Sequence, residues 1–141
     1  PIYIDTLGFE TIASFSFEKI EAIASYSYLK KDADYGRPDI VGSFYALNFP
    51  EHRVTLGLIW DMIESVEVRI DNEWRKQYQN PLRVGPDSSF SSHLAASYYP
   101  SIINDLEVFI AYDKPWDEDF QDVPGTPGRG DQFSLGATYS W

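Results

Sequence analysis

The chain has 141 residues, no cysteine, and 22 acidic against 11 basic residues, which gives a net charge of −11. This length suits one domain. The lack of cysteine excludes a disulfide scaffold and a thiolate metal site, and the acidic balance argues against a nucleic-acid-binding protein. There is no apolar run of about 18 residues, so no transmembrane helix is predicted, but a membrane-spanning β-strand needs only about 9–11 residues.

The first half of the chain alternates apolar and polar residues with a period of two, which predicts β-strands with two unlike faces. Three strands are predicted here, Leu7–Phe17, Ile20–Tyr28 and Val54–Met62. A tight turn at Glu18-Lys19 joins the first two strands. Isolated isoleucines interrupt the polar faces, so the alternation is strong without being perfect.

The second half repeats this pattern, most clearly in the predicted strand Val66–Tyr78. One of its faces carries valine, isoleucine and tryptophan together with Asn72. The other carries five successive charges, Glu67, Arg69, Asp71, Glu73 and Arg75. Because unpaired charges cannot lie in a dry core, we predict that this face is hydrated. The remaining predicted strands are Phe90–Tyr98, Leu106–Tyr112 and Phe133–Trp141.

The predicted connections alternate between short and long. The short ones are Glu18-Lys19, Glu64-Ser65 and residues 100–105, and the long ones are roughly residues 31–52, 79–89 and 113–130. Short turns at one end of a sheet and long loops at the other are typical of outer-membrane barrels. We therefore predict an all-β fold, an antiparallel up-and-down transmembrane β-barrel segment of about seven strands.

Aromatic residues favour the same prediction, because they gather at both ends of the outward face with aliphatic residues between them. The membrane-interface aromatics predicted toward the short turns are Phe15, Phe17, Trp60, Tyr98, Tyr139 and Trp141. Those predicted toward the long loops are Tyr26, Tyr28, Trp74, Tyr78 and Tyr112. A soluble antiparallel sheet with aromatic cross-strand pairs is the alternative, but it gives no reason for two aromatic levels.

Seven strands do not close such a barrel, because single-chain bacterial examples have even strand numbers from about 8 upward. The sequence also begins at Pro1, without an initiator methionine or a signal region. We therefore expect residues 1–141 to be a piece of a larger barrel.

Several short motifs follow one another in a characteristic order. They are LGFE (7–10), ASYSYL (24–29), NFPEHRV (48–54), DEDFQ (117–121), PGRG (127–130) and SLGATYSW (134–141). Together they resemble the C-terminal barrel portion of TonB-dependent outer-membrane receptors, although no single motif is specific. The sequence departs from the family pattern at Lys114-Pro115-Trp116, where many members have an asparagine-containing motif, and at Trp141, where phenylalanine is commoner.

This resemblance implies a multi-pass protein of the bacterial outer membrane, part of a barrel of about 22 strands. It implies uptake of a siderophore, cobalamin, glycan or similar small ligand, with no enzymatic activity and no cofactor. The implied partners are the lipid bilayer, the remainder of the barrel, and a plug domain and TonB-contacting segment that residues 1–141 lack. In the family, terminal aromatics such as Tyr139 and Trp141 belong to a signal read by the barrel-assembly machinery.

The long loops hold the residues that we predict to contact a ligand, because aromatic and arginine side chains suit a chelate or a glycan. These residues are Tyr35, Arg37 and Tyr45 in the first long loop and Arg83 in the second. The acidic residues Asp113, Asp117, Glu118, Asp119 and Asp122 are compatible with Ca²⁺, but they lack the EF-hand order and are interpreted as a hydrated loop.

No catalytic or metal site is predicted. The spacing of His52 and His93 does not indicate a metal site, no G-x-S-x-G nucleophile motif occurs, and residues 125–130 lack the lysine of a phosphate-binding loop. Two other functions stay open. They are a passive porin-like or structural outer-membrane barrel, which lacks a plug, and a soluble β-sandwich ligand-binding module.

Overall fold

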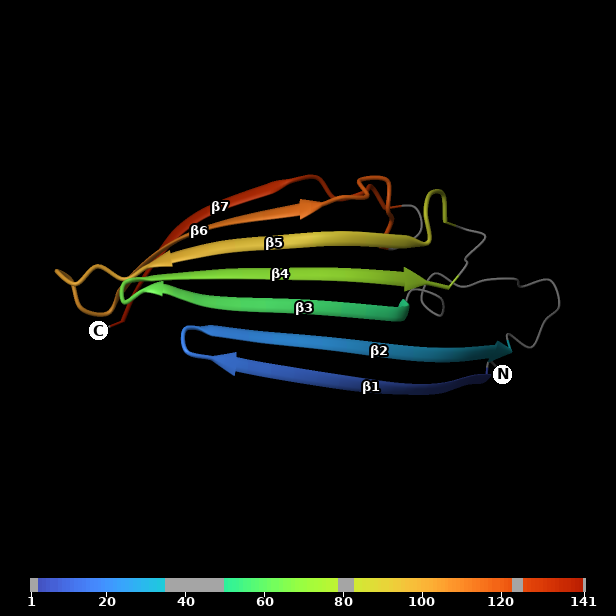
Figure 1. Ribbon diagram of the computed structural model, residues 1–141. Helices are drawn as coiled ribbons and strands as arrows, with labels where there is room; N and C mark the ends of the chain where they lie inside the picture. The colour runs from blue at the N-terminus through green and yellow to red at the C-terminus, as the bar shows by residue number, and fades with distance from the viewer. Residues whose placement is uncertain (1–2, 35–49, 79–82, 123–125, 141) are drawn as a thin grey trace.

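The computed structural model describes residues 3–34, 50–78, 83–122 and 126–140 and shows one antiparallel sheet (Figure 1). Its seven strands pair in chain order from β1 to β7. The strands are β1 (Tyr3–Phe17), β2 (Ile20–Asp34), β3 (Pro50–Ile63), β4 (Val66–Gln77), β5 (Ser88–Tyr98), β6 (Leu106–Pro115) and β7 (Gln132–Tyr139). In the described ranges no helix has the length and apolarity needed to span a membrane.

All seven predicted strands are confirmed, but several boundaries differ. β1 and β2 pair as far as Tyr3 and Asp34, well beyond the predicted limits, because backbone pairing continues where the alternation of apolar and polar residues has been lost. β4 ends at Gln77 and not at Tyr78, and β7 ends at Tyr139 and not at Trp141, so these two predicted strand ends are wrong. Trp141 lies outside the described residues.

The short connections lie at one end of the sheet and the longer ones at the other, as predicted (Figure 1). Glu18 and Asp105, in the first and third short connections, adopt positive φ angles of 48° and 63°. Backbone hydrogen bonds also link neighbouring hairpins at this end, from Asp61 N to Lys19 O (2.9 Å) and from Tyr99 N to Ser65 O (2.8 Å). The turns therefore form one connected edge, here called the turn end.

The turn end runs obliquely across the strands. Ile20, the first residue of β2, lies opposite Trp60 of β3, and Trp60 lies opposite Val68 of β4. However, β4 begins two residues before Val68, at Val66. The same offset recurs between β4 and β6, which begins at Leu106. Two residues correspond to about 6.8 Å along a strand and two strand spacings to about 9.6 Å, so the strands tilt by about 35° from the normal to the turn end.

The register gives the sheet two unlike faces. The apolar face is formed by odd residues of β1 and β7 and even residues of β2 to β6, and the polar face by the alternate set. Aliphatic members in the middle of the apolar face are Ala13, Ala22, Ala24, Leu56, Leu58, Val68, Ile70, Leu94, Ala96, Val108, Ile110, Leu135 and Ala137. Among the described residues only Ala111 and Phe120 are buried and apolar, so the apolar face is uncovered.

Aromatic side chains on the apolar face follow the oblique turn end. Phe15 of β1 lies opposite Ala22 of β2, which lies opposite Leu58 of β3. Trp60 is two residues beyond Leu58, toward the turn end. The same displacement, two strands across and two residues toward the turn end, relates Trp60 to Tyr98 and Tyr98 to Tyr139. With the strands tilted, these four aromatic residues on alternate strands lie at one level. At the opposite level lie Phe9, Tyr26, Tyr28, Trp74, Tyr112 and Phe133.

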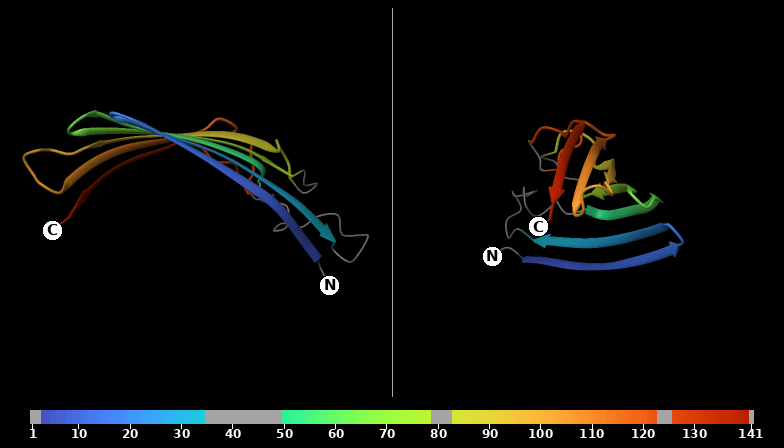
Figure 2. Two further views of the ribbon diagram at one scale, coloured as in Figure 1. Left: turned by 60° about the horizontal axis from the view of Figure 1, so that its bottom comes forward. Right: turned by 90° about the vertical axis from the view of Figure 1, so that its left-hand side faces the viewer.

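The sheet is bowed and strongly twisted, so that β1 and β2 lie at a steep angle to β6 and β7 (Figure 2). Two glycines on the polar face allow close cross-strand contacts. A Cβ added at Gly57 would lie 2.9 Å from Asp71 Oδ1, and one added at Gly136 would lie 2.5 Å from the ring of Phe109. Phe109, which interrupts the polar face, therefore covers the glycine opposite it.

Candidate functional site: a hollow on the polar face

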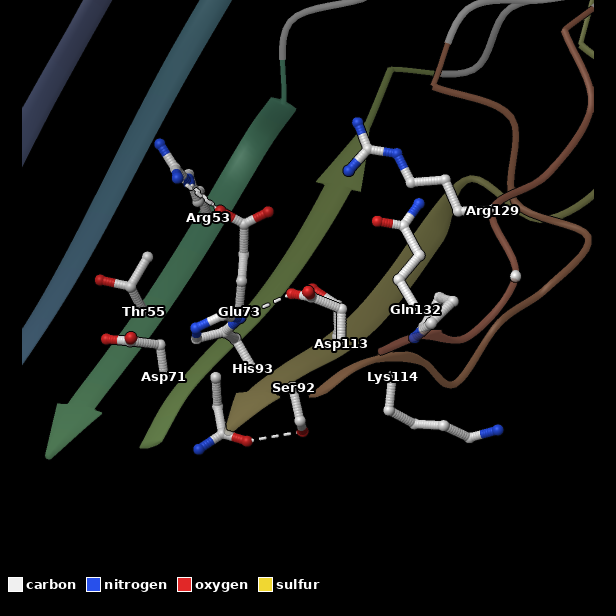
Figure 3. Close-up of a pocket in the computed structure, with 14 residues that line it drawn as sticks. Arg53, Thr55, Asp71, Glu73, Ser92, His93, Asp113, Lys114, Arg129 and Gln132 are labelled. Carbon is white, nitrogen blue, oxygen red and sulfur yellow. Dashed lines mark hydrogen bonds and ion pairs between the residues drawn. The ribbon is translucent and has the colours of Figure 1, made fainter. Parts of the chain in front are cut away.

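The polar face is hollowed toward the loop end, where a pocket of about 560 Å³ lies between β3 and the loop that precedes β7 (Figure 3). Four strands and this loop contribute charged or hydroxyl side chains. They include Arg53 and Thr55 on β3, Asp71 and Glu73 on β4, Ser91 and His93 on β5, Asp113 on β6, and Arg129 before β7. Strand alternation explains most of this gathering, because these strand residues have polar-face parity. Asn72, Ser92 and Lys114 also line the pocket, although they have apolar-face parity.

Glu73 links two arginines of the polar face. The register sets Thr55 opposite Glu73 and Arg53 opposite Arg75, so the Glu73 carboxylate lies diagonal to Arg53. Arg53 Nε donates to Glu73 Oε2 at 2.5 Å, and Arg75 Nε lies 3.9 Å from Glu73 Oε1. The charged face that the sequence predicts to be hydrated is therefore internally paired, and its side chains remain in contact with solvent.

His93 stands between two carboxylates in one pairing row, with Asp71 on one side and Asp113 on the other. Its Nδ1 lies 2.7 Å from Asp113 Oδ1. His52 lies on the apolar face, where its Nδ1 is 2.8 Å from the Tyr26 hydroxyl. The two histidines are therefore on opposite faces of the sheet. In the described ranges no group of three or more histidine and acidic side chains is placed to hold a metal ion.

The connection from β6 to β7, here called the β6–β7 loop, folds over the edge of the hollow. It begins alongside β5, where Trp116 N donates to Phe90 O (2.9 Å) and Phe90 N donates to Asp117 Oδ2 (2.8 Å). Further along, Asp122 forms ion pairs with Arg75 on β4 and with Arg129, whose Nε is 2.7 Å away. One carboxylate thus joins two guanidinium groups that are far apart in the sequence.

Phe120 anchors the same loop. Its ring is only 5% exposed, and the guanidinium carbons of Arg75 and Arg83 lie 4.7 and 5.9 Å from the ring centroid. The Arg83 side chain is 1% exposed. Its Nη1 donates to Tyr78 O (3.2 Å) and to Asp87 Oδ1 (3.0 Å), whereas Nε and Nη2 have no hydrogen-bond acceptor in the described part of the chain.

Tyr78 follows directly after the last residue of β4, Gln77, and its side chain contacts the backbone of β2. Its hydroxyl accepts from Lys31 N (2.8 Å) and donates to Leu29 O (2.9 Å), next to the pair of Tyr28 on β2 with His52 on β3. The side chain therefore completes the hydrogen bonding of a neighbouring strand. Burial of this hydroxyl raises the pKa of Tyr78 above its ordinary value.

A second polar cluster lies at the loop end of the apolar face. Asp131 accepts from the Tyr112 hydroxyl (2.6 Å) and from Lys114 Nζ (2.9 Å), and Trp116 Nε1 donates to Ser92 Oγ (3.0 Å). The hydrogen bond from Tyr112 and then that from Lys114 lower the pKa of Asp131 below its ordinary value. This cluster gives the apolar face a polar margin on the loop side.

The predicted ligand contacts are only partly placed. Tyr35, Arg37 and Tyr45 lie outside the described residues, and Arg83 lies beside the Phe120 ring and does not line the hollow. The acidic residues considered for Ca²⁺ are dispersed, since Asp113 pairs with His93, Asp117 with a backbone amide and Asp122 with arginines.

Sequence reasoning identified Arg75 in the charged row of β4 but missed the hollow and its two arginines, Arg53 and Arg129. Strand parity alone puts Arg53 and Arg75 on one face, which is a signal that was present in the sequence. The approach of Asp122 and Arg129 to that face depends on how the β6–β7 loop folds, and periodicity carries no information about it.

Comparisons with known proteins give no further assignment: no family model, no curated protein and no solved structure matches this chain.

Proposed function

We propose that this chain forms part of the wall of an outer-membrane β-barrel that takes up a small ligand, in the manner of the TonB-dependent receptors that its motifs resemble. Under this proposal the apolar face meets lipid, and the polar face lines a water-filled interior. The observation that carries the proposal is the continuity of the apolar face, which extends in register over all seven strands.

The size of this face favours lipid over water. Seven strands at about 4.8 Å each span about 34 Å, and eight residues along them about 27 Å, so the projected area is about 900 Å². The largest apolar patch on a typical soluble monomer is about 300–600 Å². Individual side chains are strongly exposed, such as Leu135 at 73% and Phe15 at 63%.

The oblique turn end adds independent support. The tilt of about 35° lies within the range of about 35–45° that is typical of outer-membrane barrels. At this tilt Phe15, Trp60, Tyr98 and Tyr139 share one level, as rings at a membrane interface should. A second sheet packed on the apolar face, as in a soluble sandwich, would not need aromatics at two levels.

Adjacent alanines of β5 give a sharp test, because Ala95 has polar-face parity and Ala96 has apolar-face parity. The chain has no cysteine, so each single variant carries one thiol. In lipid vesicles, Ala95→Cys should react with a charged maleimide at least about tenfold faster than Ala96→Cys, because a membrane-embedded thiol is shielded from a charged reagent. Equal rates with and without vesicles would reject a lipid-facing apolar face.

Active uptake separates a receptor of this kind from a passive barrel. The hollow and the loop folded over it favour a ligand-binding wall, which a passive pore does not need. Cells that carry the complete receptor should lose ligand import when an uncoupler collapses the proton-motive force. Import that continues at the same rate would favour the passive porin-like alternative.

A further inference from the structure

We infer that the border of the hollow is a binding site for an anionic group of the ligand, a carboxylate or phosphate, and that Asp122 occupies this site in the ligand-free chain. This inference deepens the proposed function by naming the chemistry of the ligand. It rests on the arrangement of Arg75, Arg129, Asp122 and Phe120.

Two arginines converge on Asp122 from separate elements. Arg75 projects from β4, and its Nε is held by Ser89 Oγ at 3.0 Å, so Nη2 is aimed at the carboxylate. Arg129 approaches from the end of the β6–β7 loop, with its Nε 2.7 Å from Asp122 Oδ2. Paired guanidinium groups are well suited to recognising carboxylate or phosphate, because each presents several donors in a fixed plane.

The carboxylate is well placed to be exchanged for one from a ligand. The Asp122 side chain is 26% and the Arg129 side chain 71% exposed, so the pair remains in contact with water. Such pairs contribute little to stability. Arg129 also lines the hollow of about 560 Å³, which gives room for the remainder of a ligand. Two other carboxylates lie beside the site: Glu73 pairs with Arg53 and lies 3.9 Å from Arg75 Nε, and Asp117 accepts from Phe90 N.

Arg83 is a further guanidinium group beside Phe120. Its side chain is buried, yet its Nε and Nη2 have no acceptor in the described ranges. A buried donor without an acceptor is costly. Phe120 covers Arg83 and belongs to the same short stretch of loop as Asp122. Displacement of Asp122 by a ligand would lift Phe120 and expose a third guanidinium group to the anion.

The test measures binding of citrate and of inorganic phosphate to the full chain by isothermal titration calorimetry, in detergent micelles and in buffer. Asp122→Asn should raise the affinity for citrate by about tenfold or more, because the internal competitor loses its charge. Arg75→Gln and Arg129→Gln should each lower it by about tenfold or more. Arg69→Gln is the matched control, since Arg69 lies on the same face of β4 but pairs with Asp71.

Hydrogen exchange on the unsubstituted chain supplies a readout that needs no variant. Citrate should speed exchange at the Phe120 amide, which donates to Asp117 O at 3.1 Å in the closed loop. Absence of citrate and phosphate binding to both the unsubstituted chain and Asp122→Asn would overturn the inference, as would weaker binding by Asp122→Asn. The single variants Ala95→Cys and Ala96→Cys test the membrane placement separately. Failure of the anion-binding inference can therefore be distinguished from failure of the proposed membrane function.

Discussion

The two faces of this sheet share one backbone but are stabilised in different ways. On the polar face, side chains pair with one another across strands, as Arg53 does with Glu73 and Ser97 Oγ with Glu107 at 2.7 Å. On the apolar face, contacts between rings such as Phe9 and Tyr26 (5.6 Å between centroids) leave most of the apolar surface uncovered. The polar face therefore supplies its own partners, whereas the apolar face depends on its surroundings.

The largest expected effect comes from placing a charge on each face at neighbouring positions of β3. Leu58 belongs to the middle of the apolar face and Ile59 to the polar face. In lipid vesicles, Leu58→Arg should lower the free energy of unfolding by about 2–4 kcal/mol, the cost of arginine near the bilayer midplane. Ile59→Arg should cost less than about 1 kcal/mol. Urea titrations measure both values, and equal losses would contradict the assignment of the two faces.

The contact between Phe109 and Gly136 can be broken on the polar face alone. Gly136→Val places a side chain where the Phe109 ring already lies, at 2.5 Å from a Cβ. Overpacking of this kind should lower the free energy of unfolding by about 1–3 kcal/mol. Gly130→Val is the control, because nothing lies within 4 Å of its added Cβ. The double variant with Phe109→Ala should recover most of the loss, and no recovery would argue against this contact.

Removal of the Phe120 ring should loosen the β6–β7 loop without opening the sheet. Phe120→Ala should cost about 2 kcal/mol locally, which is less than the about 3–5 kcal/mol of a fully enclosed phenylalanine. Hydrogen exchange at Trp116 and Phe120 should become about 30-fold faster, while amides of β4 keep their rates. Phe133→Ala is the control, because Phe133 is 65% exposed on the other face. Unchanged exchange in Phe120→Ala would show that the ring does not anchor the loop.

The smallest effect concerns the polar margin of the apolar face. Because the pKa of Asp131 is lowered in the folded chain, its contribution to stability is present above the ordinary aspartate pKa and is lost as the pH falls through the folded value. Acid titration followed by NMR should therefore show the Asp131 carboxyl taking up its proton below about pH 3.9. The hydrogen bonds to Tyr112 and Lys114 should be lost in the same pH range. Asp131→Asn should remove this transition, and a titration at the ordinary value would contradict the pairing.

The strands were predictable because alternation depends only on neighbouring residues. The charges of β4 and the apolar residues of β3 fix the faces before any tertiary contact is known. The ends were less predictable. At residues 30–34 of β2 the alternation of apolar and polar residues is lost, and pairing there follows from the partner strand and not from the pattern.

The candidate site was less predictable for a related reason. Arg75 was identified as part of a charged row, but its partner Asp122 lies 47 residues away in a loop of acidic residues. Composition cannot show which acidic residue reaches β4. The close approach at Gly136 was likewise hidden, because Phe109 and Gly136 look like two separate interruptions until the register sets them opposite each other.

Pairing only between consecutive strands has a consequence for the order of assembly. The three hairpins close through short connections, so β1–β2, β3–β4 and β5–β6 can form with little loss of chain entropy. Docking of one hairpin on the next requires closure of a longer loop and should be slower. Pulse-labelling hydrogen exchange should therefore protect the Ala13–Ala24 region of the first hairpin before the β2–β3 ladder. The bond from Asp61 N to Lys19 O, which spans two hairpins, should appear only with the later step.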